Sequence, residues 1–409
     1  MKKKTIKKMP KNLQPLVDKI EKFPKKVLLS APHMSGHEIK YIQKAIKENW
    51  VTPQGPNVND FENELCKFAL KTKKPITELY AVGMSSGTAA IHIALRLLNI
   101  KPGDEVFISS ATFIASAYPV MYEKAVPVFI DSEPTTWNMC PESLKKAFEK
   151  KSKDGKLPKA VICVDLYGMS SRYNEIREIC KKYNVPIIQD AAEALGSDYF
   201  GEACGIQGEF GIYSFNGNKI ITTSSGGVLL TRSKALADKA LFYVTQARDK
   251  SPYYLHSDVG YNYRLSNISA GIGLGQIKVL PKRVKQRRKV YDYYKKNLES
   301  VGLEFLPEPN GFFSNRWLST ATFSKKLLQK KNITALDFIL KLAEYNIEAR
   351  PIWKPMHTQP IFAKNEYFSV HKKSVAEDIF ERGLCFPSCT DMSLPTQKKV
   401  CEIIKALLA

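Results

Sequence analysis

The sequence predicts an α/β protein in which a mostly parallel sheet is covered by helices on both faces. From about residue 79 to residue 190, short apolar runs alternate with amphipathic segments of helical period. This alternation is typical of successive βαβ units. The chain has 409 residues, of which 44% are hydrophobic and 25% charged. That composition is typical of a soluble globular protein with a large buried core.

Two amphipathic helices are predicted before the sheet begins. The first opens at Gly36 and ends at Asn49, and the second covers residues 59–70. The segment between them contains Pro53, Gly55 and Pro56, so it is predicted to be a loop. Residues 1–26 carry ten lysines against two acidic residues. We expect this stretch to form a basic arm outside the main fold.

Five apolar runs are predicted to be the strands of the parallel sheet, and amphipathic segments connect them. The strands are expected at residues 79–83, 105–109, 126–131, 160–165 and 186–189, and the helices from residue 85 to about 98 and at 114–124, 141–150, 173–183 and 232–247. A helix from residue 266 is expected to continue past Pro281 to about residue 298.

The order of elements changes after that helix. Strands are predicted at residues 316–323 and 347–350, and helices at 335–345 and 395–408. This order indicates a smaller α+β domain. The predicted division is therefore a basic arm at 1–26, a large domain at 27–285 and a small C-terminal domain at 286–409.

The formal net charge of +22 could attract nucleic acid or phosphorylated metabolites. No aromatic-interleaved basic patch or zinc finger accompanies it, so nucleic acid is not the expected partner, although a basic nucleic-acid-binding or regulatory protein stays an alternative. The eight cysteines form no C-x-x-C pair and no metal-ligand cluster with histidine. Neither a membrane span nor a signal peptide is recognisable, and we expect a cytoplasmic protein with reduced thiols.

The stretch F-G-I-Y-S-F-N-G-N-K-I-I-T-T-S-S-G-G, residues 210–227, places Lys219 between two short strand-like runs. Desolvation of a lysine favours its neutral amine, which can attack an aldehyde. Taken alone, however, the stretch favours an exposed lysine in a polar hairpin. The functional interpretation therefore depends on other motifs.

Two other motifs supply what this lysine would need. Ser86-Gly87-Thr88 opens a predicted helix and indicates either a phosphate site or a plain helix cap. Asp190 ends an apolar strand and could pair with a protonated ring nitrogen or cap a helix, and Glu193 lies three residues further on. A phosphate cradle, a carboxylate and a lysine are together the three requirements of pyridoxal 5'-phosphate.

Several longer motifs then resemble the DegT/StrS family of sugar-nucleotide aminotransferases. The resemblance covers the chain from about Leu28 to the C-terminus and is carried by S-S-G-T-A-A-I-H-I-A-L, A-T-F-I-A-S, D-A-A-E-A-L-G, Y-S-F-N-G-N-K, G-Y-N-Y-R-L-S-N and R-P-I-W-K-P-M-H. It implies a fold-type-I, aspartate aminotransferase-like fold and pyridoxal 5'-phosphate as cofactor. Relatives that act as dehydratases have histidine in place of the lysine, so Lys219 implies transamination.

The resemblance also implies roles for individual residues. Lys219 would bind the cofactor covalently and later shuttle a proton at carbon 4 of the sugar, and Asp190 would keep the ring nitrogen protonated. Phe113 would stack on the ring, and Asn262 would reach the phosphate of a neighbouring subunit, which implies a homodimer with shared active sites. The implied cofactor-binding residues are Gly87, Thr88, Phe113, Asp190, Glu193, Ser214, Lys219 and Asn262.

The substrate side rests on the same resemblance, and core packing is an equal alternative for Trp50 and Trp353. The residues implied are Asn49, Trp50, Val51, Thr52, Tyr213, Arg350, Pro351, Ile352, Trp353 and His357. The motifs N-R-W-L-S-T, R-P-I-W-K-P-M-H and E-R-G-L-C-F-P-S resemble carbon 4 aminotransferases of the bacillosamine pathway. They imply L-glutamate as amino donor and a UDP-2-acetamido-2,6-dideoxy-4-keto-hexose as acceptor, with GDP- or dTDP-linked 4-keto-6-deoxy sugars as alternatives.

Overall fold

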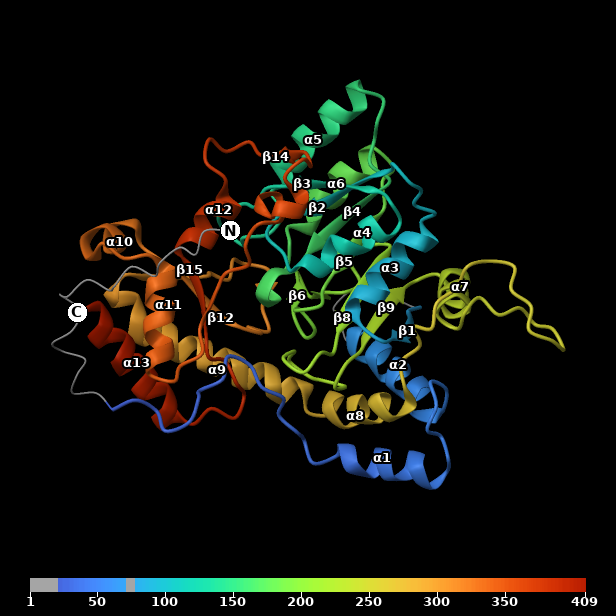
Figure 1. Cartoon of the computed structure of the whole chain (residues 1–409), viewed down its shortest axis with the longest axis horizontal. Coiled ribbons are helices and arrows are strands. Elements are labelled where there is room, and N and C mark those ends of the chain that lie inside the picture. Colours follow the sequence, from blue (N-terminus) through green and yellow to red (C-terminus); the bar gives the residue numbers. More distant parts are fainter. Residues whose placement is uncertain (1–20, 71–77) are drawn as a thin grey trace.

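An eight-stranded sheet forms the centre of the protein, which is represented by a computed structural model that describes residues 21–70 and 78–409 (Figure 1). The strand order is β1-β9-β8-β5-β4-β2-β3-β14. β9 is antiparallel to both its neighbours, and the other five neighbouring pairs are parallel. The strands are β1 (Tyr80–Met84), β2 (Glu105–Ser109), β3 (Val126–Ile130), β4 (Ala160–Val164), β5 (Ile187–Asp190), β8 (Phe210–Ser214), β9 (Gly227–Thr231) and β14 (Tyr367–Phe368). The predicted α/β class is thus confirmed.

Helices cover both faces of this sheet because its strands are apolar on both sides. Val106 and Ile108 pack on one face with α3 (Gly87–Leu97) and α7 (Lys234–Val244), whereas Phe107 between them packs on the opposite face. That alternation is the two-residue period of a strand. The opposite face is covered by α2 (Pro56–Ala69), α5 (Pro141–Lys153), α6 (Tyr173–Lys182) and α8 (Asn267–Ile277). The helix α1 (Glu38–Lys47) packs along α8.

A second sheet of four strands follows in the C-terminal third, with the order β10-β12-β15-β13 (Figure 1). Its strands are β10 (Leu303–Phe305), β12 (Ser319–Phe323), β13 (Arg350–Pro351) and β15 (Gly383–Phe386). Residues of α9 (Leu280–Leu298), α11 (Ala335–Glu344) and α13 (Leu394–Leu408) share one apolar cluster with it. The predicted boundary at residue 285 falls inside α9, so the division into domains stays a prediction.

The remaining elements are short. They are the helices α4 (Tyr118–Tyr122), α10 (Lys325–Lys331) and α12 (Val375–Arg382), and a small sheet of β6 (Asp198–Tyr199), β7 (Glu202–Ala203) and β11 (Phe312–Phe313). β14 comes from the C-terminal third yet pairs with β3 of the main sheet. This strand therefore ties the C-terminal segment to the edge of the large sheet.

Three predicted elements differ from the observed ones for local reasons. The helix expected to run through Pro281 is two helices, because α8 ends at Ile277 and Pro281 occupies the first turn of α9. The strand expected from Arg316 begins only at Ser319, since Arg316 has a left-handed backbone with φ of 52°. The strand expected at 347–350 shares only Arg350 with the observed β13, which continues to Pro351.

Residues 1–20 of the predicted basic arm lie outside the described residues. All eight cysteines are described; they are free thiols, and seven of them are buried. Among residues 21–70 and 78–409, no helix combines the length and the apolar character needed to cross a membrane.

Candidate active site

A cavity of about 330 Å³ opens at the carboxyl ends of three neighbouring parallel strands. Val164, Asp190 and Ser214, the last residues of β4, β5 and β8, all line it. Open α/β sheets bind ligands at this edge, because loops and helix N-termini converge there. The remaining lining residues are Ser86, Gly87, Thr88, Ile91, Thr112, Phe113, Ala115, Ser116, Ala192, Glu193, Asn216, Asn218, Lys219, Ser225, Gly226, Trp317 and Trp353.

Lys219 lies in the loop that joins the antiparallel strands β8 and β9, whose last pair is Ser214 with Gly227. Its side chain is only 13% exposed, and its Nζ lies 3.7 Å from Oε1 of Glu193. The same Nζ lies 4.2 Å from the ring centroid of Trp317. The exposed hairpin lysine that the stretch favoured in isolation is therefore not what the structure shows. The amine lies inside the cavity.

Asp190 is buried at the base of the cavity. Its Oδ2 accepts a hydrogen bond of 2.6 Å from Oγ of Ser116, and its Oδ1 accepts one of 3.2 Å from the backbone N–H of Ala192. Burial raises the pKa of this carboxyl, while the Ser116 hydroxyl, the Ala192 amide and Lys219 act in the opposite direction. Three groups thus favour the carboxylate form at a site that has little access to water.

Glu193 lies between Lys219 and the loop that follows β4. Its Oε2 accepts a 2.7 Å hydrogen bond from the backbone N–H of Tyr167, which leaves Oε1 toward Lys219. Burial raises the pKa of Glu193, and the nearby Lys219 lowers it. The carboxyl can therefore hold or release a proton beside the lysine.

The N-terminus of α3 forms the polar wall of the cavity. Ser86 caps the helix by accepting a hydrogen bond of 3.0 Å from the N–H of Ala89. Gly87 packs closely on Ser214, since an added Cβ at Gly87 would lie 3.2 Å from the Ser214 Cβ. The first amides of a helix and adjacent hydroxyls suit a phosphate group. The Lys219 amine, the buried Asp190 carboxylate and the phosphate cradle at the N-terminus of α3 all face one cavity. Together they fit pyridoxal 5'-phosphate.

Eight of the predicted site residues line this cavity, from five separate parts of the chain. They are Gly87, Thr88, Phe113, Asp190, Glu193, Ser214, Lys219 and Trp353. The rings of Phe113 and Trp353 lie 5.2 Å apart, and Phe113 is 51% exposed. These two aromatic residues form an apolar wall of the cavity.

Five other predicted substrate residues lie elsewhere in the structure. Tyr213 is buried, and its hydroxyl donates to the backbone carbonyl of Cys204. Ile352 is buried in the core, and Arg350 extends into solvent beside Glu348. His357 stacks on Tyr367 at 3.7 Å between ring centroids. Pro351 pairs with Leu384 in the second sheet.

The other predicted residues, Asn49 to Thr52 and Asn262, lie on the surface of this chain. Trp50 and Val51 are 41% and 63% exposed, and the carbonyls of Trp50 and Thr52 accept hydrogen bonds from Asn267. Asn262 is exposed and forms a bridge with Thr245. The preceding loop projects from the body of the protein beyond α7 (yellow in Figure 1). None of these residues lines the cavity of its own chain.

Two residues that contact Asp190 and Lys219 directly were not predicted from the sequence. Ser116 donates to Asp190, and Trp317 lies beneath Lys219. Both belong to motifs quoted above, A-T-F-I-A-S and N-R-W-L-S-T, but neither motif indicates which side chain faces the cavity. Thr112, Asn216, Asn218 and Ser225 also line it.

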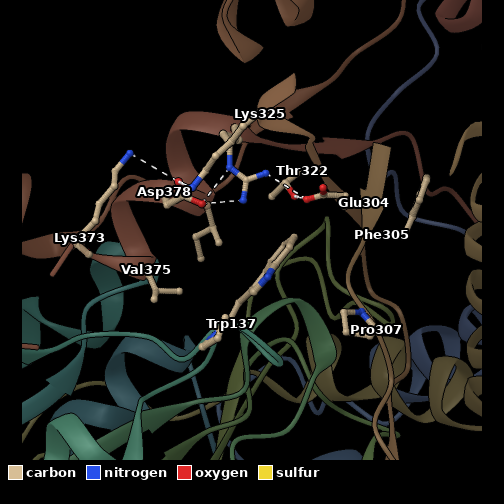
Figure 2. Close-up of a pocket in the computed structure, with 13 residues that line it drawn as sticks. Trp137, Glu304, Phe305, Pro307, Thr322, Lys325, Lys373, Val375 and Asp378 are labelled. Atoms are coloured by element: carbon tan, nitrogen blue, oxygen red, sulfur yellow. Dashed lines mark hydrogen bonds and ion pairs between the residues drawn. The ribbon is translucent and has the colours of Figure 1, made fainter. Parts of the chain in front are cut away.

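A second cavity, of about 410 Å³, lies between the second sheet and α12. Figure 2 shows Lys325 and Lys373 directed toward Asp378, with the indole of Trp137 below them. Arg382 also pairs with Asp378, at 2.6 Å. These cations pair with the Asp378 carboxylate, and both lysines are more than half exposed, so the cavity contains no buried amine. Its contacts are those of a structural ion-pair cluster.

Comparison with known proteins identifies the kind of site. Residues 32–405 match the DegT/DnrJ/EryC1/StrS aminotransferase family. This chain belongs to that family. The "Putative pyridoxal phosphate-dependent aminotransferase EpsN" of Bacillus subtilis is 50% identical over 93% of this chain and 95% of its own length. A crystal structure of a family member from Brucella abortus has a TM-score of 0.81 at 27% identity, covering 90% of this chain and 95% of that one.

Two further relatives have names that include a nucleotide sugar. The GDP-perosamine synthase of Escherichia coli O157:H7 is 34% identical over 91% of this chain and 96% of its own length. The UDP-4-amino-4,6-dideoxy-N-acetyl-beta-L-altrosamine transaminase of Campylobacter jejuni is 28% identical over 93% of this chain and 97% of its own length. The chain is accordingly a pyridoxal 5'-phosphate-dependent sugar aminotransferase of amino-sugar biosynthesis.

Proposed function

We propose that this enzyme transfers the amino group of L-glutamate to carbon 4 of a nucleotide-linked 4-keto-6-deoxy sugar. The observation that carries the proposal is the convergence of Lys219, Glu193 and Asp190 in one cavity beside the N-terminus of α3. The relative from Campylobacter jejuni, whose name specifies a 4-amino-4,6-dideoxy sugar, supports the position of the amino group.

Each residue of the cavity has a defined part in this proposal. When bound, the cofactor supplies an electron sink for the electron pair left at a carbon that loses its proton. The Lys219 amine would hold the cofactor through its aldehyde, and as a free amine it would move a proton at carbon 4 of the sugar. Asp190 holds a proton on the ring nitrogen, since a buried carboxylate stabilises a neighbouring cation.

Glu193 and the walls of the cavity position these groups. The Oε1 atom of Glu193, 3.7 Å from Nζ of Lys219, stabilises the ammonium form of the lysine. Gly87, Thr88 and Ser214 hold the phosphate, and Phe113 and Trp353 exclude water from one side of the cavity.

For the acceptor we propose a UDP-2-acetamido-2,6-dideoxy-4-keto-hexose. The motifs of residues 315–320, 350–357 and 381–388 support this choice. A GDP-linked 4-keto-6-deoxy sugar is the second candidate, because the GDP-perosamine synthase is the more similar of the two relatives named for a nucleotide sugar. The two acceptors differ in the base and in the 2-substituent, so a few loop residues can decide between them.

The proposal is tested by supplying UDP-, GDP- and dTDP-linked 4-keto-6-deoxy sugars with L-glutamate and identifying products by NMR. We expect amination at carbon 4 and the highest kcat/KM with the UDP-acetamido sugar. A higher kcat/KM with the GDP sugar would replace the proposed acceptor by the second candidate. Amination at another carbon, or no transfer from glutamate to any of these sugars, would refute the proposed reaction.

We also propose that two chains form a cytoplasmic homodimer in which each active site uses residues of both. Asn262 and residues 49–51 are exposed on this chain, Thr52 is half-buried, and none of them lines its own cavity. Sedimentation of the purified protein tests the proposal, and a monomer that retains full activity would contradict it.

A further inference from the structure

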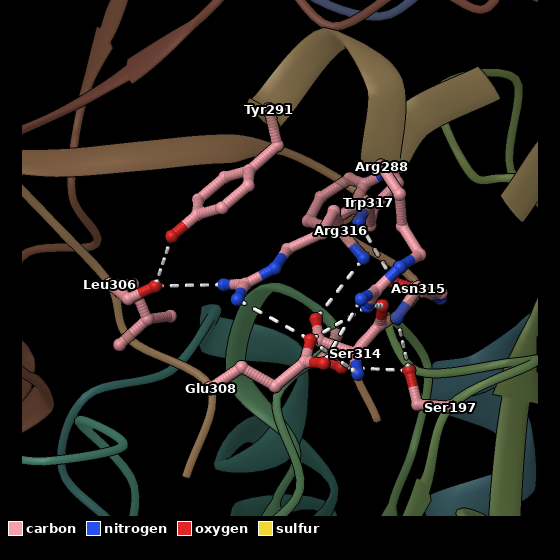
Figure 3. Close-up of polar contacts among 10 residues, drawn as sticks. Ser197, Arg288, Tyr291, Leu306, Glu308, Ser314, Asn315, Arg316 and Trp317 are labelled. Atoms are coloured by element: carbon pink, nitrogen blue, oxygen red, sulfur yellow. Dashed lines mark hydrogen bonds and ion pairs between the residues drawn. The ribbon is translucent and has the colours of Figure 1, made fainter. Parts of the chain in front are cut away.

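Three consecutive residues, Asn315, Arg316 and Trp317, connect the C-terminal third of the chain to the active site. They precede β12, and Figure 3 shows their side chains within one network of polar contacts. Arg316 has a left-handed backbone, which directs its side chain and that of Trp317 to different surroundings. All three residues are at most 5% exposed.

Trp317 contacts the lysine loop in two ways. Its indole Nε1 donates a 2.7 Å hydrogen bond to the backbone carbonyl of Asn218, the residue before Lys219. Its ring face lies 4.2 Å from Nζ of Lys219. A cation over an indole face is attracted by the π electrons, most strongly where water is excluded. The ammonium form of Lys219 therefore has a defined position between the Trp317 ring and Glu193.

Asn315 fixes the segment that carries Glu193. Its Nδ2 donates hydrogen bonds of 2.9 Å to the backbone carbonyls of both Glu193 and Leu195. Its Oδ1 accepts a 2.8 Å hydrogen bond from the N–H of Trp317. One asparagine thus couples the backbone of Glu193 to the backbone of Trp317.

Arg316 anchors the same segment on the side away from the cavity (Figure 3). Its guanidinium donates to the carbonyl of Leu306 at 2.9 Å, lies 3.4 Å from Glu308 and stacks on Tyr291 at 3.8 Å. Arg288 pairs with Glu308 at 2.6 Å and also donates to the carbonyl of Ser314. The buried cation thus has three partners, which stabilise the position of the segment.

We propose that Trp317 is a positioning residue for Lys219. Its ring holds the ammonium form of the lysine beside Glu193 whenever the lysine is not bonded to the cofactor, and Asn315 and Arg316 keep the ring in place. This inference rests on the proposed role of Lys219. It adds that the Trp317 ring controls the position in which the Lys219 ammonium holds its proton. Trp317 is thus a second residue of the C-terminal third, besides Trp353, with a part in the active site.

The experiment measures the reactivity of the free lysine in protein stripped of cofactor. Wild type, Trp317→Leu and Trp317→Phe are pulsed with acetic anhydride at pH 8 and at pH 10.5, and acetylation of Lys219 is quantified by peptide mass spectrometry. The rate at pH 8 divided by the rate at pH 10.5 reports the share of neutral amine at pH 8. A change in the access of the reagent to Lys219 alters both rates equally and cancels in this ratio. Site-specific incorporation of fluorinated tryptophan at position 317 provides a variant of unchanged shape.

We expect the ratio to rise at least about threefold in Trp317→Leu, because the ammonium form loses its aromatic partner. In Trp317→Phe it should stay within about twofold of wild type, since a smaller ring face remains. With fluorinated tryptophan it should rise with each added fluorine, a result that does not depend on the leucine variant folding. An unchanged ratio in both the leucine and the fluorinated proteins would overturn the proposal.

The same samples separate this proposal from the proposed function. Borohydride reduction of wild type loaded with pyridoxal 5'-phosphate tests whether Lys219 binds the cofactor. Trapping at another lysine would refute the role of Lys219 whatever the acetylation ratio shows. Trapping at Lys219 with an unchanged ratio would refute only the role of Trp317.

Discussion

Removal of the Ser116 hydroxyl should selectively impair the enzyme at acidic pH. In the wild type this hydroxyl donates a 2.6 Å hydrogen bond to Oδ2 of Asp190. Burial already raises the pKa of Asp190, and the Ser116 bond opposes that rise. A hydrogen bond to a charged group contributes about 1.5–3 kcal/mol, which corresponds to about a tenfold or greater change in the ratio of carboxylate to carboxylic acid.

Ser116→Ala therefore favours the protonated form of Asp190, which cannot hold a proton on the ring nitrogen. On the acidic limb of the pH profile we expect kcat/KM to fall by about tenfold or more. On the alkaline plateau, where Asp190 is ionised in both proteins, the loss should be less than about threefold. The measurement is kcat/KM from pH 5 to 9 for both proteins.

Ser143→Ala is the matched control, because Ser143 is equally buried but its hydroxyl accepts from the N–H of Val370, away from the cavity. It should leave the shape of the pH profile unchanged. An equal loss at all pH values in Ser116→Ala would refute the reasoning, because it would show that the hydroxyl acts by packing and not on the ionisation of Asp190.

Three further predictions concern stability and assembly. Burial raises the pKa of Asp165 from 3.8 to about 7, so this carboxyl binds more protons in the folded state between these values, and its contribution to the free energy of unfolding should fall as pH rises from about 4 to 7. Relative to the wild type, the free energy of unfolding of Asp165→Asn in urea should therefore increase as pH rises over this range, and a difference that does not change with pH would contradict this. Mixing Lys219→Ala with Asn262→Ala should restore activity to about a quarter of wild type, because half of the dimers regain one intact site; no recovery would contradict shared sites. Phe61→Ala, at a fully buried ring 5.1 Å from Phe215, should lower the free energy of unfolding by about 3–5 kcal/mol in urea titrations, and a loss below about 1 kcal/mol would contradict this packing.

The centre of the site could be predicted from the sequence because its residues lie at positions that the topology brings together. Asp190 ends a parallel strand, Lys219 follows the end of a neighbouring strand, and Thr88 opens a helix. In a parallel sheet such positions share one edge, whatever the distances along the chain. The motifs and the fold class therefore both predicted a site at the carboxyl ends of the parallel strands.

The alternation of side chains along a strand explains the placement of Tyr213. Because Ser214 lines the cavity, the preceding residue must point to the other side of the sheet, and Tyr213 indeed reaches the carbonyl of Cys204. Ile352, which is buried in the core, and Trp353, which lines the cavity, are also neighbours with different surroundings. They follow β13 and belong to no strand, so no periodicity separates them.

Ser116 and Trp317 could not be predicted, since their contacts depend on packing between distant segments. Trp317 reaches Lys219 across 98 residues of sequence, and its direction depends on the left-handed backbone of Arg316. No residue pattern within N-R-W-L-S-T predicts that backbone. β14, which has only two residues, likewise gives no periodic signal, yet it joins the main sheet.

The covalent binding of the cofactor by Lys219 can be measured directly. The protein is loaded with pyridoxal 5'-phosphate, reduced with borohydride and digested, and the modified peptide is identified by mass spectrometry, with Lys219→Arg as control. We expect a single pyridoxyl group on the wild-type peptide that contains Lys219 and no pyridoxyl group on the control protein. A pyridoxyl group on another lysine, or an unmodified wild-type protein, would contradict it.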